Sequence, residues 1–138
     1  MHLNAYLNFD GNCEAAFKFY QQCLGGEIVA MMPFGETPAC EHVPADQRDK
    51  IMHARLMIGE EALMGSDCCG PEHPYEGVKG CSVAIQVNDP ARAEEIFNGL
   101  AENGSVTMPI QETFWAARFG MLVDQFGVPW MVNCEQPA

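Results

Sequence analysis

The sequence is poor in basic residues. It contains 7 Lys and Arg against 19 Asp and Glu, which gives a formal net charge of −12 at pH 7. A nucleic-acid-binding surface needs a patch of Lys and Arg to neutralise phosphates, and the few basic residues here are scattered along the chain. The composition therefore argues against a nucleic-acid partner, and an anionic ligand would need a local basic group to hold it.

Long apolar runs and a secretory signal are also missing. The apolar stretches are far shorter than the roughly 18 residues that a membrane-spanning helix needs. The N-terminal segment places polar Asn4 and Asn8 among its apolar residues and has neither a basic region nor a small-residue cleavage site. These absences predict a cytoplasmic protein without a membrane partner.

The seven cysteines form no disulfide pattern. Their number is odd, and none stands in a CxxC arrangement, which favours free thiols in a reducing compartment. The segment Asp67-Cys-Cys-Gly-Pro-Glu-His73 gathers thiols and an imidazole, but its spacing matches no zinc pattern and indicates a plain loop. Cys13 follows a helix-capping residue and is expected to be a small buried residue rather than a nucleophile.

The elements that the sequence does predict repeat in the same order in two halves. The first half predicts a strand at 3–9, a helix after a cap at Asn12 that ends at Gly25-Gly26, and strands at 27–34, 51–58 and 62–64. A segment rich in Pro and Gly, residues 68–79, predicts a linker. The second half predicts a strand at 81–87, a helix cap at Asn88-Asp89-Pro90 followed by a helix at 91–103, and strands at 106–110, 114–123 and 129–132.

Each predicted helix carries one apolar stripe at helical spacing. The first stripe is expected to comprise Ala15, Ala16, Phe19, Tyr20 and Cys23. The second is expected to comprise Ala93, Ile96, Phe97 and Leu100. Both helices are therefore expected to lie with one side against a sheet.

Six segments spread over nearly the whole chain carry a family resemblance. They are Tyr6-Leu-Asn-Phe-Asp-Gly11, Ala16-Phe-Lys-Phe-Tyr20, Met52-His-Ala-Arg-Leu56, Leu63-Met-Gly-Ser-Asp67, Gln111-Glu-Thr-Phe-Trp115 and Asp124-Gln-Phe-Gly-Val-Pro-Trp130. In combination they resemble the PhnB-like branch of the vicinal oxygen chelate superfamily, which includes glyoxalases, bleomycin-resistance-like proteins and extradiol dioxygenases.

The resemblance implies an α+β fold in which tandem βαβββ modules form a curved mixed β-sheet around a cavity, with helices on the outer face. It implies a single glyoxalase/bleomycin-resistance-like domain over residues 1–138, built of modules 1–70 and 77–138 joined by a short linker, and it favours a homodimer. The branch is often labelled a demethylubiquinone methyltransferase. That activity is not expected, because the first strand and helix are joined only by Asp10-Gly-Asn12 and not by a glycine-rich cofactor turn.

Metal-dependent members of the superfamily hold a divalent ion with His and Glu from the first and last strand of each module. The corresponding positions here are Asn4 or His2, Met64 or Ser66, Ser82 and Met131. These residues are poor substitutes for a His and carboxylate set, so neither a metal nor another cofactor is predicted. An atypical metal site that recruits His2, His53 or Glu112 would instead indicate a lyase, isomerase or dioxygenase.

The strand at 51–58 supplies two candidate ligand-binding residues. His53 and Arg55 share the strand face opposite Ala54 and Leu56, and Arg55 offers a planar donor fork to an anion. Asn4 and Tyr6 lie on the equivalent face of the first strand. A pair at the sheet surface, with a structurally satisfied histidine, is the alternative interpretation.

Residues 111–133 predict a long closing hairpin that turns at Asp124-Gln-Phe-Gly127, and this hairpin supplies further candidates. Gln111 and Trp115 lie near Arg118 on this hairpin. The large ring of Trp115 would stack on a planar ligand, although Trp115 also suits a core or a dimer interface. Glu112 and Asp124 are candidate general bases, and Asp124 has a simpler role in its turn. Trp130 is expected to serve packing.

Together these features predict a small-molecule-binding protein of the PhnB-like type, without a catalytic metal. The predicted ligand-binding residues are Asn4, Tyr6, His53, Arg55, Gln111 and Trp115. The alternatives are the atypical metal enzyme and a homodimeric interaction module whose open sheet edges pair.

Overall fold

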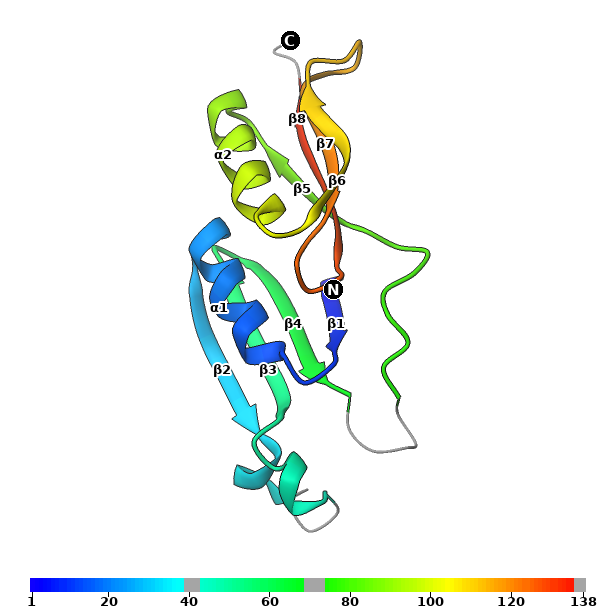
Figure 1. The fold of residues 1–138 in the computed structure, drawn as a ribbon. Helices are drawn as coiled ribbons and strands as arrows, with labels where there is room; N and C mark the ends of the chain where they lie inside the picture. The colour runs from blue at the N-terminus through cyan, green and yellow to red at the C-terminus, as the bar shows by residue number, and fades with distance from the viewer. Residues whose placement is uncertain (39–42, 69–73, 136–138) are drawn as a thin grey trace. The chain divides into compact units, whose positions relative to one another are not determined.

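The computed structural model describes residues 1–38, 43–68 and 74–135 and divides the chain into two compact units, Met1–Gly77 and Val78–Ala138. Each unit carries one 12-residue helix and four strands in the order strand, helix, three strands (Figure 1). The predicted tandem βαβββ architecture is therefore confirmed.

Unit 1 is a four-stranded mixed sheet with one helix. Its elements are β1 (Ala5–Phe9), α1 (Cys13–Leu24), β2 (Glu27–Pro33), β3 (Ile51–Ile58) and β4 (Glu61–Asp67), with short 3-10 turns η1 (Phe34–Glu36) and η3 (Ala45–Gln47) between β2 and β3. The strand order is β1-β4-β3-β2, and β1 runs parallel to β4 while the other neighbours are antiparallel.

Unit 2 repeats this topology. Its elements are β5 (Val83–Val87), α2 (Pro90–Ala101), β6 (Ser105–Gln111), β7 (Ala116–Val123) and β8 (Pro129–Glu135). The order β5-β8-β7-β6 has the same single parallel pair, β5 with β8. The strands hydrogen-bond within two four-stranded sheets, one in each unit.

Several predicted strand bounds differ from the observed ones. The strands at 62–64 and 129–132 were predicted too short, since β4 extends to Asp67 and β8 to Glu135. Phe114 and Trp115 were predicted as strand but precede β7. The reason is a tight turn: Thr113 and Ala116 bond through their backbones at 3.0 Å, and the Thr113 hydroxyl accepts the Ala116 amide at 3.0 Å.

The first backbone amide of helix α1 donates a hydrogen bond to a carboxylate that is distant in the sequence. Asn12 stands at the N-cap position, as predicted, but its side chain makes no capping hydrogen bond. Instead, the Cys13 amide donates to Asp67 Oδ1 at 2.9 Å, and the Ile51 amide donates to Asp67 Oδ2 at 2.8 Å. Asp67, 4% exposed, thus links the end of β4 to the starts of α1 and β3.

The buried stripe of α1 differs from the predicted one. Its buried residues are Cys13, Ala16, Phe17 and Tyr20, whereas Ala15 is exposed. Phe17 and Tyr20 contact Phe9 of β1, with ring centroids 6.0 Å and 6.4 Å apart. Helix α2 follows the prediction, because Ala93, Ile96, Phe97 and Leu100 are buried and the Asp89 side chain accepts the Ala91 amide at 3.1 Å.

One glycine in each sheet lets an aromatic ring of the helix approach. A Cβ on Gly65 in β4 would lie 2.9 Å from Phe17 Cε1, and a Cβ on Gly120 in β7 would lie 2.6 Å from Phe97 Cε2. Real Cβ atoms do not come this close, so a larger residue at either position would push the helix away from the sheet.

Within the described part of the chain, no helix is both long and apolar enough to span a membrane.

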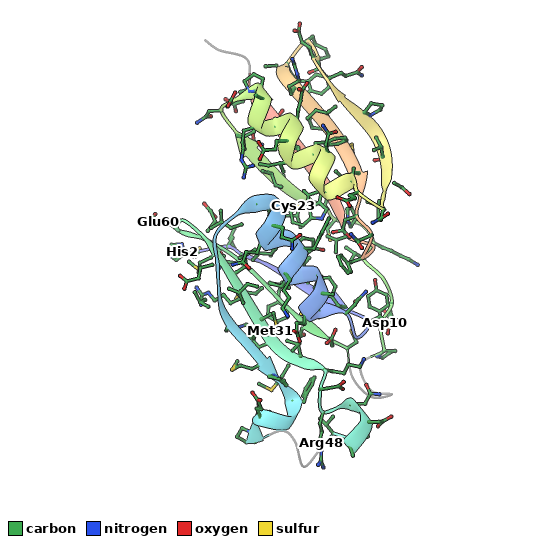
Figure 2. The ribbon with its side chains drawn as sticks, turned by 60° about the vertical axis from the view of Figure 1, so that its left-hand side comes forward. His2, Asp10, Cys23, Met31, Arg48 and Glu60 are labelled. Atoms are coloured by element: carbon green, nitrogen blue, oxygen red, sulfur yellow. The ribbon has the colours of Figure 1, made fainter. Side chains whose placement is uncertain are left out.

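We expect Asp67→Ala to lower the free energy of unfolding by roughly 2–4 kcal/mol, because two backbone amides would lose a charged acceptor in a buried position. Urea denaturation followed by circular dichroism measures this change. Asp10→Ala is the matched control, since Asp10 is exposed in the turn before α1 (Figure 2). Equal effects of the two substitutions would contradict the role assigned to Asp67.

Candidate functional site

The helix of unit 1 covers only one face of its sheet (Figure 1). Leu7, Phe9, Ala54 and Leu56 are buried on the side that α1 covers. Because side chains alternate along a strand, their neighbours project from the opposite side, which we call the helix-free face of unit 1. The candidate residues of β1 and β3 lie on this face.

Tyr6 and His53 contact each other on the helix-free face of unit 1. Tyr6 Oη lies 3.2 Å from His53 Nδ1, and the rings stack with centroids 5.8 Å apart at 24°. When the Tyr6 hydroxyl donates to Nδ1, the neutral imidazole carries its hydrogen on Nε2. The pair thus offers a flat surface and an N–H donor, from strands that β4 separates.

Arg55 lies on the same face, paired in register with Met64, which in turn pairs with Tyr6. It is exposed, and its Nε donates to the Met57 sulfur at 3.3 Å. Sulfur is a weak acceptor. Within the described residues Arg55 forms no ion pair, unlike Arg92 and Arg118.

The segment ahead of β1 carries the remaining candidates of unit 1. Asn4 and His2 are both exposed and precede the first strand. Figure 2 labels His2. The structure brings neither of them into a hydrogen bond with Tyr6, His53 or Arg55 in the part of the chain that it describes.

In unit 2, Trp115 and Gln111 both adjoin Phe119, a residue that the sequence analysis did not select. The Trp115 ring is 50% exposed and meets the rings of Phe114 and Phe119 edge-on, at 4.7 Å and 5.5 Å. Gln111 of β6 pairs with Phe119 of β7 in the sheet register. Gly120 and Leu122 of β7 are buried, and Phe119 lies on the opposite face of the strand. This alternation is the signal that could have identified Phe119 as a candidate.

Arg118, in contrast, lies on the other side of its sheet. Its Nε donates to Glu94 Oε1 of α2 at 2.9 Å, so its charge is engaged with the helix. Phe119 and its neighbours therefore project from the side that α2 leaves open, the helix-free face of unit 2.

Two amide side chains on that face also escaped the sequence analysis. Asn133 Nδ2 donates to Gln86 Oε1 at 2.7 Å, and the two residues pair in register across β5 and β8. Asn133 Oδ1 is buried and has no hydrogen-bond partner among the described residues.

The carboxylate of Asp124 has a structural role and not the role of a general base. It is 3% exposed and accepts the amides of Phe126 and Val128 and the Trp130 indole, at 2.8, 3.1 and 2.7 Å. This confirms the simpler role in its turn and the packing role of Trp130. Glu112, the other candidate base, is exposed.

Comparison with known proteins identifies the family. The Glyoxalase/Bleomycin resistance protein/Dioxygenase superfamily matches residues 2–132. The chain belongs to this superfamily.

Individual relatives of this glyoxalase superfamily agree with the match. The chain is 36% identical to protein YjdN of Escherichia coli, over 99% of both chains. The crystal structure of protein PA1353 from Pseudomonas aeruginosa shares 57% identity and a TM-score of 0.90, over 99% of both chains. A PhnB protein from Bacillus cereus has the same fold at 22% identity, with a TM-score of 0.79 over 97% of this chain and 99% of that one.

The positions that the family resemblance assigns to metal ligands include two methionines, Met64 and Met131. Met131 pairs with Ala84 and Met121, and Met64 lies between Tyr6 and Arg55. The thioethers of Met64 and Met131 do not match the imidazole and carboxylate set of a lyase or dioxygenase metal. In residues 1–38, 43–68 and 74–135, no three His, Cys, Asp or Glu are placed to hold an ion; Cys69 and His73 lie outside these ranges.

Neither thiol near the start of α1 is activated. Burial raises the pKa of the Cys13 thiol, and the negative charges of Asp67 and Glu14 raise it further. Burial, followed by the charges of Asp10, Asp67 and Glu76, also raises the pKa of Cys68. Cys13 is fully buried, as the sequence analysis expected.

We expect stability to fall with rising pH above the ordinary thiol pKa of 9.0, in part because of Cys13. Above that pH the unfolded chain releases the thiol proton while the folded chain keeps it, so alkali favours unfolding. In Cys13→Ala the decline between pH 9 and 11 should be shallower, as measured by urea denaturation at each pH. Cys81→Ala changes an exposed thiol and serves as the control. Identical pH slopes for all three proteins would contradict the assignment.

Proposed function

We propose that this glyoxalase-superfamily protein binds a small, planar or anionic molecule on the helix-free faces of its sheets, without a catalytic metal. The observation that carries the proposal is the Tyr6–His53 pair, hydrogen-bonded at 3.2 Å, with Arg55 on the same face. Arg55 donates only to a sulfur and forms no ion pair among the described residues. An anion and a flat ring are the two features that such a surface recognises.

Arg55 supplies the charge in this proposal. A guanidinium donates two parallel hydrogen bonds to a carboxylate, which gives both affinity and orientation. Because the chain as a whole carries a net charge of −12, the surrounding field does not favour an anion, and its binding depends on this local donor.

Tyr6 and His53 supply a flat surface and a second donor. The stacked pair presents ring area, Tyr6 being 47% exposed, and the His53 Nε2–H can point at the same anionic group. Asn4, just ahead of β1, adds an amide to this set. In unit 2, Trp115 and Gln111 supply an aromatic surface and an amide next to Phe119.

The proposal includes no reaction. We also propose a homodimer, a cytoplasmic location and a single domain built of two modules; the family resemblance supports the dimer and the single domain, and the cysteine pattern supports the location.

We expect Arg55→Ala to weaken the binding of benzoate, a flat carboxylate, by about 10-fold to 100-fold, which is the scale of a lost charged hydrogen bond. A chemical-shift titration of the backbone amides measures the affinity and reports whether the fold is retained. Arg48→Ala removes the same charge from an exposed position beside η3 and is the matched control (Figure 2). If both variants bind benzoate as tightly as the parent protein, the role proposed for Arg55 is contradicted.

The absence of a metal requirement has its own test. We expect protein purified without a histidine tag to melt at the same temperature after chelator treatment and after addition of Zn, Mn, Ni or Fe. A site saturated to 100 times its Kd would add about 2.7 kcal/mol of stability, which a melting curve resolves easily. A stoichiometric metal that raises the melting temperature would overturn the metal-free proposal and favour the lyase, isomerase or dioxygenase alternative.

A further inference from the structure

A row of polar and aromatic side chains crosses the whole sheet of unit 2. Gln86 pairs with Asn133, Asn133 with Phe119, and Phe119 with Gln111, so β5, β8, β7 and β6 each contribute one residue at the same level. Three steps between neighbouring strands span roughly 14 Å, which is enough to hold a one-ring or two-ring molecule. We call these four residues the amide row.

The hydrogen bonding within the amide row is incomplete. The Asn133 amide group donates to Gln86 Oε1 at 2.7 Å, which leaves the Gln86 Nε2 hydrogens directed away from that contact. Asn133 Oδ1 has no partner in the described part of the chain, although native proteins leave few buried polar atoms unpaired. A donor group on a ligand that reaches Oδ1 would complete the hydrogen bonding of Asn133.

The centre of the row is aromatic. Phe119 lies between Asn133 and Gln111 in the register, and the half-exposed Trp115 ring stands edge-on to it at 5.5 Å. A flat ring can stack there while its polar edge faces the amides on either side.

The charges around the amide row differ from those around Arg55. Arg118, the basic residue of β7, is paired with Glu94 of α2 on the other side of the sheet. The exposed residues that adjoin the row, Glu112 after β6 and Glu135 at the end of β8, are acidic. These carboxylates disfavour an anionic ligand and leave hydrogen bonding and stacking as the means of recognition.

We infer that the amide row of unit 2 binds an uncharged flat ring that carries adjacent hydrogen-bond donors and acceptors, such as a carboxamide, lactam or nucleobase-like heterocycle. A primary amide reads such an edge because it presents one donor and one acceptor in a plane, the geometry by which Asn and Gln bind adenine. Gln86 and Asn133 together present two amides, and Trp115 and Phe119 cover the ring. The inference rests on the proposed function, because Trp115 and Gln111 take part in both.

Three rings of this chemistry serve as probes: nicotinamide, uracil and adenine. In a ¹H–¹⁵N titration of the full chain we expect them to shift the Trp115 indole signal and the side-chain amide signals of Gln86, Asn133 and Gln111. The Trp130 indole, which is buried and bonded to Asp124, provides the internal reference and should not move. Failure of all three rings to shift the Trp115 and amide signals would overturn the inference.

A matched ligand isolates the amide contact. 3-Acetylpyridine has the shape of nicotinamide but carries a methyl group in place of the amide NH₂, so it keeps the stacking and loses the donor. We expect it to bind about tenfold more weakly. Equal affinities for the two molecules would overturn recognition by the amide row.

Matched variants separate this site from the face that carries Arg55. We expect Gln86→Leu and Asn133→Ser each to weaken nicotinamide binding by about tenfold and to leave benzoate binding unchanged. Gln22→Leu, at an exposed position of α1, should change neither. If the Gln86→Leu and Asn133→Ser proteins fold and bind nicotinamide with the parental affinity, the inference is overturned. A result for Arg55→Ala that concerns benzoate alone bears on the proposed function and not on the amide row.

Discussion

The packing of one helix against one face of a four-stranded sheet is the interaction on which the rest of each unit depends. In unit 1, Phe17 and Tyr20 of α1 pack on Phe9, and Gly65 provides the space that the Phe17 ring needs. Because strand side chains alternate, burying one face commits the other residues to the opposite side. Tyr6, His53 and Arg55 share a surface for that reason.

Two buried carboxylates hold this packing in place by accepting backbone amides. Asp67 connects α1 and β3 to the end of β4, and Asp124 organises the turn before β8 and holds the Trp130 indole. A buried carboxylate is stable only when its oxygens are well supplied with donors, so both residues are committed to structure. Arg55, Gln86 and Asn133 make other contacts: Arg55 donates to the Met57 sulfur, and Asn133 donates to Gln86. These are the residues that we propose for ligand binding.

The parts of the fold that the sequence predicted are those with strong local signals. Strand 51–58 was predicted with its observed bounds, and the cap at Asp89 and the stripe of α2 were confirmed. The stripe of α1 was predicted correctly at Ala16 and Tyr20 but missed Phe17. The first amide of α1 donates to Asp67, 54 residues away, and not to the side chain of the neighbouring Asn12. A local pattern contains no information about an acceptor that arrives from another strand.

The same division applies to the candidate sites. Alternation alone placed His53 and Arg55 on one face, and the repeat of elements with its family resemblance determined the superfamily. Only the tertiary structure brought Tyr6 to His53 and aligned Gln86, Asn133, Phe119 and Gln111 in one row. The physical reason is that a residue's face follows from the period of its own strand, whereas its neighbours across the sheet follow from strand order and register, which long-range pairing decides.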